Sequence, residues 1–179
     1  MSRMPGITRD KLDPEAQRIW DNILANRSGA AMRGPSAALI AVPPLAERVM
    51  NTEDYFRTDA DLPAQDRELV ILTVAREFEA HFPWARHEAR GKEAGMRPEA
   101  IEILRSRGSL DELTSREKLL VDVVHGLLRN HRLSDELFER VNKELGQRQF
   151  VELLALMGNY CLIGIVADAY EIPEDSKTF

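Results

Sequence analysis

The chain has 179 residues, 44% of them hydrophobic, which is enough to bury one sizeable core, and no shift in composition divides it. We therefore expect a single domain over residues 1–179. The formal net charge is −6, and Lys and Arg are spread along the chain rather than clustered, so nucleic acid is not expected as a partner. The lone cysteine, Cys161, excludes an internal disulfide, and the first residues lack the apolar core of a signal peptide; we expect a cytoplasmic protein.

Residues 1–62 are predicted to form N-terminal helices and a loop. Asp13 and Pro14 mark the start of a helix over 13–27, because proline is favoured at the first helical position. The small-residue stretch "RSGAAMRGPSAAL" that follows, residues 27–39, is predicted to be a mobile loop. The proline pair at 43 and 44 begins a second helix over 43–58.

Residues 63–108 contain the signals of a helical hairpin followed by a short helix. A third helix is expected over 62–77, with the leucines and valines at 69, 70, 72 and 74 on its buried side. It should break at residues 78–82, because Pro83 is tolerated in a first turn but not inside a helix. A fourth helix then runs over 84–95 and ends at Gly95, and a fifth runs over 97–108 with Pro98 in its first turn.

Residues 114–172 complete the chain with three more predicted helices. Thr114 and Glu117 form a capping box that starts the first of them, and a second runs from Ser134 to Gly146. The apolar run over 150–172 approaches the length of a membrane span, but Glu152, among other polar residues, interrupts it and no basic flank anchors it. We expect no membrane contact and predict a core helix or one buried between subunits. No segment alternates polar and apolar residues over a sustained run, so the fold class is all-α.

An internal repeat is visible when these elements are laid side by side. "DRELVILTVAREF" aligns with "SREKLLVDVVHGL" at an offset of 49, so that Glu68 matches Glu117. The alternative is that any two amphipathic helix pairs align this well. The position that answers His87 falls near Leu137, so chemistry held by the first copy is not repeated in the second.

The stretch "EFEAHFPWARH", residues 77–87, lies at the hairpin corner and holds the most chemically suggestive residues. Trp84 and His87 are three apart and share a helix face. Glu68 and His87 would be separated by roughly 28 Å on one straight helix. Folding back at the corner makes contact between these two side chains feasible.

The spacing of Glu68, Ala80, Pro83 and His87 resembles the active-site pattern of alkylhydroperoxidase D-like proteins, in which a glutamate, a Cys-x-x-C pair and a histidine take these places. Both cysteine positions are replaced here. Together with "RELVILTVARE", "FPWARHEARGKEAGM" and the C-terminal "ELLALMGNYCLIGIVADAYEIP", the pattern looks like that of the cysteine-free carboxymuconolactone decarboxylase family. The resemblance spans most of residues 15–173. It implies a helical fold of two related hairpins and homo-oligomers, either trimers or hexamers made from them.

The resemblance implies decarboxylation of a small cyclic or aromatic-derived carboxylic acid or lactone, with no cofactor if the substrate's own carbonyl takes up the electrons. The reaction needs groups that orient the acid, an apolar wall and a proton donor. His87 is the candidate acid/base, because imidazole titrates near neutral pH, and Glu68 would fix its tautomer. The candidate substrate-binding residues are Trp84 as the wall and Arg57, Arg33 or His81 for the carboxylate, with Arg57 favoured because it lies in a matched segment.

Two other reaction classes find little support. Peroxidase chemistry needs an attacking and a resolving thiol, which Ala80 and Pro83 cannot supply, and Cys161 lies in the most apolar segment. His81 and His87, six apart across a proline, fit neither a helical zinc pair nor a zinc-finger spacing, so no metal is expected. Two alternatives to decarboxylation stay open: another proton-transfer reaction, such as isomerisation, hydration or cyclisation, and a non-catalytic oligomeric binding module.

Overall fold

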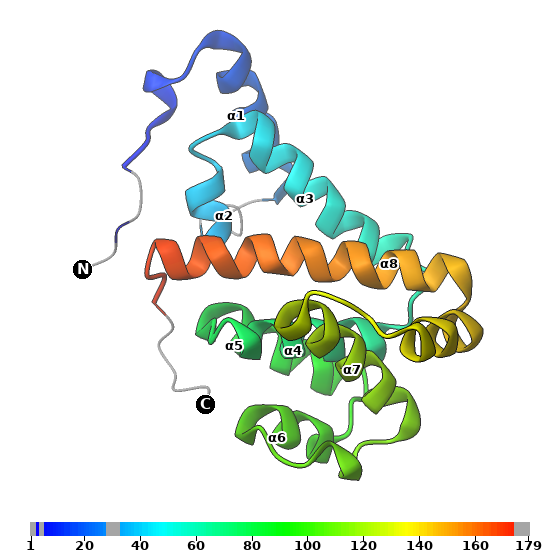
Figure 1. The fold of residues 1–179 in the computed structure, drawn as a ribbon. Coiled ribbons are helices and arrows are strands. Elements are labelled where there is room, and N and C mark those ends of the chain that lie inside the picture. The colour runs from blue at the N-terminus through cyan, green and yellow to red at the C-terminus, as the bar shows by residue number, and fades with distance from the viewer. Residues whose placement is uncertain (1–2, 4–5, 28–32, 174–179) are drawn as a thin grey trace. The chain divides into compact units, whose positions relative to one another are not determined.

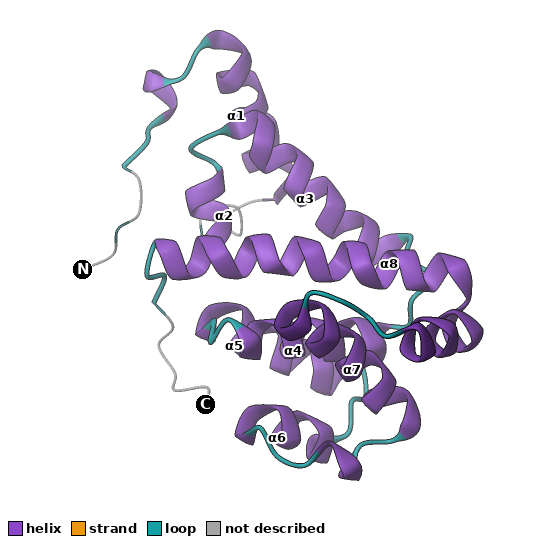
Figure 2. Ribbon diagram, in the orientation of Figure 1, coloured by secondary structure: helices purple, strands orange, loops and turns teal. Residues whose placement is uncertain are grey.

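The computed structural model describes residues 3, 6–27 and 33–173, and within these ranges every regular element is a helix (Figures 1 and 2). The all-α prediction is confirmed. The contacts group residues up to 59 with 165–173 in one compact unit and residues 60–164 in a second. The expectation of a single domain over the whole chain stays a prediction.

The first unit contains η1 (Arg9–Lys11), α1 (Pro14–Arg27), α2 (Gly34–Leu39) and α3 (Pro43–Thr58), and α3 packs against both α1 and α2. The helix starts at Pro14 and Pro43 are as predicted. The prediction of a loop over 27–39 is wrong at its C-terminal end. Residues 28–32 lie outside the described residues, but Gly34–Leu39 forms α2, because Pro35 presets the first turn and the alanines that follow favour helix.

The second unit is built around α4 (Ala64–Glu77), which packs against α5 (His81–Glu93), α6 (Pro98–Ser106) and α7 (Ser115–Asn130). All seven residues from Leu69 to Ala75 are buried, including the four predicted on the buried side. This run, apolar except for Thr73, covers every face of the helix, so α4 forms the core of this unit. The remaining turn, η3 (Leu110–Glu112), leads to α7, whose predicted capping box between Thr114 and Glu117 is present.

The hairpin corner is tighter than predicted. Residue Glu79 takes a left-handed conformation with φ of +51°, and the amide of Ala80 donates to the carbonyl of Ala75 to close the end of α4. Helix α5 then starts at His81 rather than at Pro83 or beyond. Pro83 is the third residue of the new helix, where its missing N–H costs no intrahelical bond.

The chain's longest helix, α8 (Asp135–Ala169), is interrupted at Gly146, where φ of +73° and ψ of 166° break the helical path. This is the predicted end of the helix that starts at Ser134. Among the described helices, α8 is the one long and apolar enough to cross a membrane by length and composition, although 44% of its most apolar window is buried in the protein. Leu153 and Leu156 face the interior, whereas Val151 and Leu154 are exposed.

Candidate functional site

Glu68 and His87 meet across the α4–α5 hairpin. Nδ1 of His87 lies 2.7 Å from Oε2 of Glu68, and the two side chains are only 7% and 14% exposed. Because an ionised carboxylate can only accept, Nδ1 carries a proton and donates it, which leaves Nε2 as the nitrogen that gains or loses a proton. The contact that the fold-back made feasible is present in the structure.

The two helices approach one another closely at this point. Gly91 lies one turn after His87 on α5, and a Cβ added there would be 3.7 Å from Cβ of Glu68 and 2.6 Å from Sδ of Met96. A Cβ at this position would push aside the flexible end of Met96, whereas its contact with Glu68 would be an ordinary van der Waals contact. The backbone of α5 therefore lies close to α4 beside the Glu68–His87 bond.

Two residues that the sequence interpretation did not select converge on the other ring nitrogen of His87. Oη of Tyr160, from α8, lies 3.0 Å from Nε2, and the two rings meet edge to face with centroids 4.9 Å apart and planes at 84°. Nη1 of Arg90, from α5, lies 3.5 Å from the same nitrogen. Nε2 is thus surrounded by a hydroxyl group and a cation.

Arg90 differs from most arginines of this unit in its partners. Arg90 is exposed, and no Asp or Glu of the described chain forms an ion pair with it. In contrast, Arg105 and Lys92 both form ion pairs with Glu88. A cation beside the reactive nitrogen, without a carboxylate of its own among the described residues, is suited to hold an anionic ligand. The signal in the sequence that could have identified Arg90 is its position three residues after His87, a spacing that places two residues near each other on one helix.

The structure buries Trp84 completely. Its indole Nε1 donates to Oε2 of Glu88 at 3.0 Å, and the guanidinium of Arg105 lies over its ring, 5.4 Å from the centroid. The side chain thus packs in the core beneath α5 and ties this helix to α6. Its role as an apolar wall against substrate stays a prediction.

The other predicted carboxylate-binding residues are His81, Arg57 and Arg33. His81 is exposed at the first position of α5. Arg57, 59% exposed and 3.4 Å from Asp54, and Arg33, exposed before α2, belong to the first unit. The substrate-binding role of these three residues stays a prediction.

The positions that carry thiols in the resembled pattern are both inside the protein. Ala80 and Pro83 are buried at the corner, and neither side chain has a reactive group. Cys161 is a free, half-buried cysteine, and burial raises the pKa of its thiol. A raised pKa lowers the fraction of reactive thiolate at neutral pH, which agrees with an unreactive residue.

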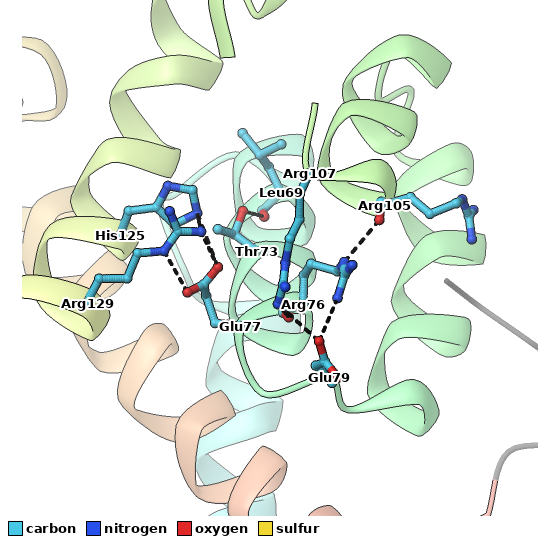
Figure 3. Close-up of polar contacts among 9 residues, drawn as sticks. All are labelled: Leu69, Thr73, Arg76, Glu77, Glu79, Arg105, Arg107, His125 and Arg129. Atoms are coloured by element: carbon cyan, nitrogen blue, oxygen red, sulfur yellow. Dashed lines mark hydrogen bonds and ion pairs between the residues drawn. The ribbon is translucent and has the colours of Figure 1, made fainter. Parts of the chain in front are cut away.

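A second polar cluster fixes the hairpin corner (Figure 3). Glu77 lies between Arg129, at 2.8 and 2.5 Å, and His125, at 3.5 Å, while Glu79 faces Arg76 and Arg107. The hydrogen bond from Arg129 holds the pKa of Glu77 below its usual value, against the opposing effect of burial. Burial, followed by the charge of Arg129, lowers the pKa of His125. These charges are mutually paired, so the cluster has a structural role in joining α4 to α7.

Within the described residues, no group of three or more His, Cys, Asp and Glu side chains is arranged to hold a metal ion.

Comparisons with known proteins give a fold and no activity. No protein-family model matches the sequence, and no curated protein matches it. A solved structure that is similar is that of an uncharacterized peroxidase-related protein from Silicibacter sp. TM1040, with a TM-score of 0.70 over 97% of this chain and 92% of that one, at 13% sequence identity. This likeness confirms the all-α, alkylhydroperoxidase D-like fold predicted from the resemblance.

Proposed function

We propose that this protein is an acid/base enzyme of the carboxymuconolactone decarboxylase type, acting on a small cyclic or aromatic-derived carboxylic acid or lactone. The observation that carries the proposal is the Glu68–His87 pair: one ring nitrogen is fixed by a carboxylate at 2.7 Å, and the other is directed toward a hydroxyl group and a cation. A nearly buried, oriented imidazole is the arrangement that general acid/base catalysis uses.

Arg90 is the residue that we propose for binding the substrate's carboxylate, in place of Arg57, Arg33 or His81. It lies 3.5 Å from Nε2 of His87, so a carboxylate bound to its guanidinium would lie close to the proton donor. Bidentate binding by arginine also fixes the plane of a carboxylate, which orients the ring attached to it.

The proposed decarboxylation begins with this bound acid. The bond between the ring carbon and the carboxylate breaks, carbon dioxide leaves, and the electron pair moves into the conjugated lactone carbonyl. The His87 imidazolium, stabilised by Glu68, is the source of the proton that the resulting enolate takes up on carbon. Neutral His87 then regains a proton from solvent. The substrate's carbonyl serves as the electron acceptor in this scheme, so we propose no cofactor and no metal.

The same pair suits a different proton-transfer reaction, which is the first alternative. In an isomerisation, hydration or cyclisation, His87 would remove a proton at one position and return it at another. The convergence of Glu68, His87 and Arg90 supports either enzymatic reaction over a non-catalytic binding module, because a binding module has no need of an oriented imidazole. Thiol peroxidase activity stays disfavoured, since Ala80 and Pro83 replace the two thiols.

The test is turnover of 4-carboxymuconolactone by the purified protein, followed as loss of ultraviolet absorbance. We expect turnover by the wild type, a loss of about 100-fold or more in His87→Gln, and unchanged turnover in His131→Asn, since His131 is exposed and its φ of +57° suits asparagine. Full activity of His87→Gln would remove His87 from the mechanism. Absence of turnover by the wild type would reject the decarboxylase and leave the other proton-transfer reactions.

We also propose that the protein is a cytoplasmic homo-oligomer, a trimer or a hexamer, as the resemblance implies. The surface that we propose for assembly is the α8 stripe, defined as Val151, Leu154, Ala155 and Gly158, which are all exposed along one side of the helix. Residues at this spacing share a helix face, and a continuous exposed apolar face is typical of an interface between subunits.

A further inference from the structure

The hydroxyl group of Tyr160 occupies a hydrogen-bonding position at Nε2 of His87. The imidazole side chain is 7% exposed, and its Nε2 lies 3.0 Å from Oη of Tyr160. The edge-to-face contact of the two rings holds the phenol in place. A substrate that took a proton directly from Nε2 would first have to displace this hydroxyl group.

We propose that Tyr160 is the catalytic residue that exchanges the proton with the substrate, and that Glu68, His87 and Tyr160 form a three-membered proton relay. The inference rests on the proposed acid/base function and assigns its last step to a residue of α8. His87 then serves as the proton reservoir behind the phenol, and Glu68 orients it. In the cysteine-free site, a hydroxyl group provides the acid/base atom that reaches the ligand.

The relay conserves protons in both directions. Nδ1 keeps its proton toward Glu68 throughout, because the carboxylate only accepts. To protonate a substrate carbon, Tyr160 gives its hydroxyl proton to the carbon and takes the Nε2 proton of the imidazolium, so His87 becomes neutral. To remove a proton, neutral His87 takes the hydroxyl proton of Tyr160 while the phenolate oxygen takes the proton of the substrate. No oxidant or reductant enters either step.

Arg90 adds a reason for the substrate to bind at this hydroxyl group. Its Nη1 lies 3.5 Å from the same nitrogen that Tyr160 contacts at 3.0 Å, so the cation and the hydroxyl group converge on one point. A carboxylate held by Arg90 would thus be anchored next to the phenol oxygen. The cation also favours the negative charge that passes between the phenol oxygen and the substrate.

The experiment compares Tyr160→Phe with His87→Gln and with Tyr170→Phe, each as the full chain turning over 4-carboxymuconolactone. Phenylalanine keeps the ring contact with His87 and removes only the hydroxyl group. Tyr170 follows the end of α8 and belongs to the first unit, so it is a matched control for the same substitution. We expect kcat to fall by about 100-fold or more in Tyr160→Phe, KM to change little, and Tyr170→Phe to match the wild type.

The outcomes separate this inference from the proposed function. Loss of kcat in His87→Gln with a retained kcat in Tyr160→Phe would overturn the relay and leave His87 as the direct acid/base. Absence of turnover by the wild type would overturn the proposed decarboxylase and, with it, the relay as the proton donor of that reaction.

A second measurement decides the question if Tyr160→Phe fails to fold. Fluorotyrosine incorporated at position 160 retains the hydroxyl group and makes it more acidic. The relay predicts that the pH profile of kcat shifts with the acidity of the phenol. A residue that only packs against His87 would leave the profile unchanged, and that result would overturn the proposal.

Discussion

Glu152 provides the sharpest test of how the site is held together, because its carboxylate joins α8, which carries Tyr160, to the start of α4, which carries Glu68. The side chain is 6% exposed and accepts from the amides of Asp61, at 2.9 and 3.1 Å, and Leu62, at 2.7 Å. Arg148 also donates to this carboxylate, at 3.2 Å, but it is 63% exposed and contributes little.

Replacing Glu152 with Ala removes these acceptors together. The amide of buried Leu62 loses its partner, which costs about 1–3 kcal/mol, and the hydrogen bond from Asp61 to a charged acceptor is worth about 1.5 kcal/mol or more. The expected loss in the free energy of unfolding is therefore about 3 kcal/mol. With a urea dependence of about 2 kcal/mol per molar, the unfolding midpoint should fall by about 1.5 M.

The assay is urea unfolding followed by the fluorescence of Trp84, which is completely buried in the same unit as Glu152. Working in a Trp20→Phe background removes the second tryptophan, which lies in the other unit. The control is Glu139→Ala, an exposed glutamate on the same helix, and it should change the free energy by no more than about 0.5 kcal/mol. A loss below about 0.5 kcal/mol in Glu152→Ala would refute the anchoring role of the carboxylate.

Three further predictions concern the polar corner, helix packing and assembly. Arg129→Gln should cost about 1 kcal/mol or less of stability at pH 7, because Arg129 is half exposed. Folding lowers the pKa of Glu77, so the stabilisation from this pair is present above the unfolded-state pKa and is lost as the pH falls through the folded-state pKa. The urea midpoints of mutant and wild type should therefore converge in acid. In Gly126→Ala the added Cβ would lie 3.0 Å from a leucine methyl carbon and 3.2 Å from a backbone carbonyl oxygen, so an overpacking cost of about 1–2 kcal/mol should offset the roughly 1 kcal/mol that alanine gains inside a helix. The melting temperature should therefore not rise, and a clear increase would contradict this packing. Leu154→Glu in the α8 stripe should reduce the molar mass measured by light scattering, and an unchanged oligomer would exclude the stripe as the interface.

The helix boundaries that the sequence predicted best are those fixed by local chemistry. Pro14 and Pro43 start helices because their rings preset the backbone, Thr114 caps α7 through its own hydroxyl group, and Gly146 breaks α8 because it alone takes the required positive φ at low cost. The short helix α2 was missed, since six residues rich in glycine, serine and alanine resemble a loop until packing against α3 selects the helical form.

The same distinction between local and tertiary contacts applies to the residues of the site. Glu68 and His87 belong to one hairpin, so their spacing and the break before Pro83 were enough to suggest the contact. Tyr160 is 73 residues away from His87, and only the tertiary packing of α8 brings the two together. The one signal available in the sequence was that Asn159 and Tyr160 place polar groups in an otherwise apolar helix.

The most direct test of the acid/base account is the position and stereochemistry of the proton that the enzyme delivers. In D₂O, the wild type should convert 4-carboxymuconolactone to a product that carries one deuterium, on a single face of the carbon that is protonated, as read by nuclear magnetic resonance. Such a result requires a fixed donor in the site, and His87→Gln should lose it together with turnover. Deuterium distributed equally over both faces would show that the proton comes from free solvent and would contradict the account.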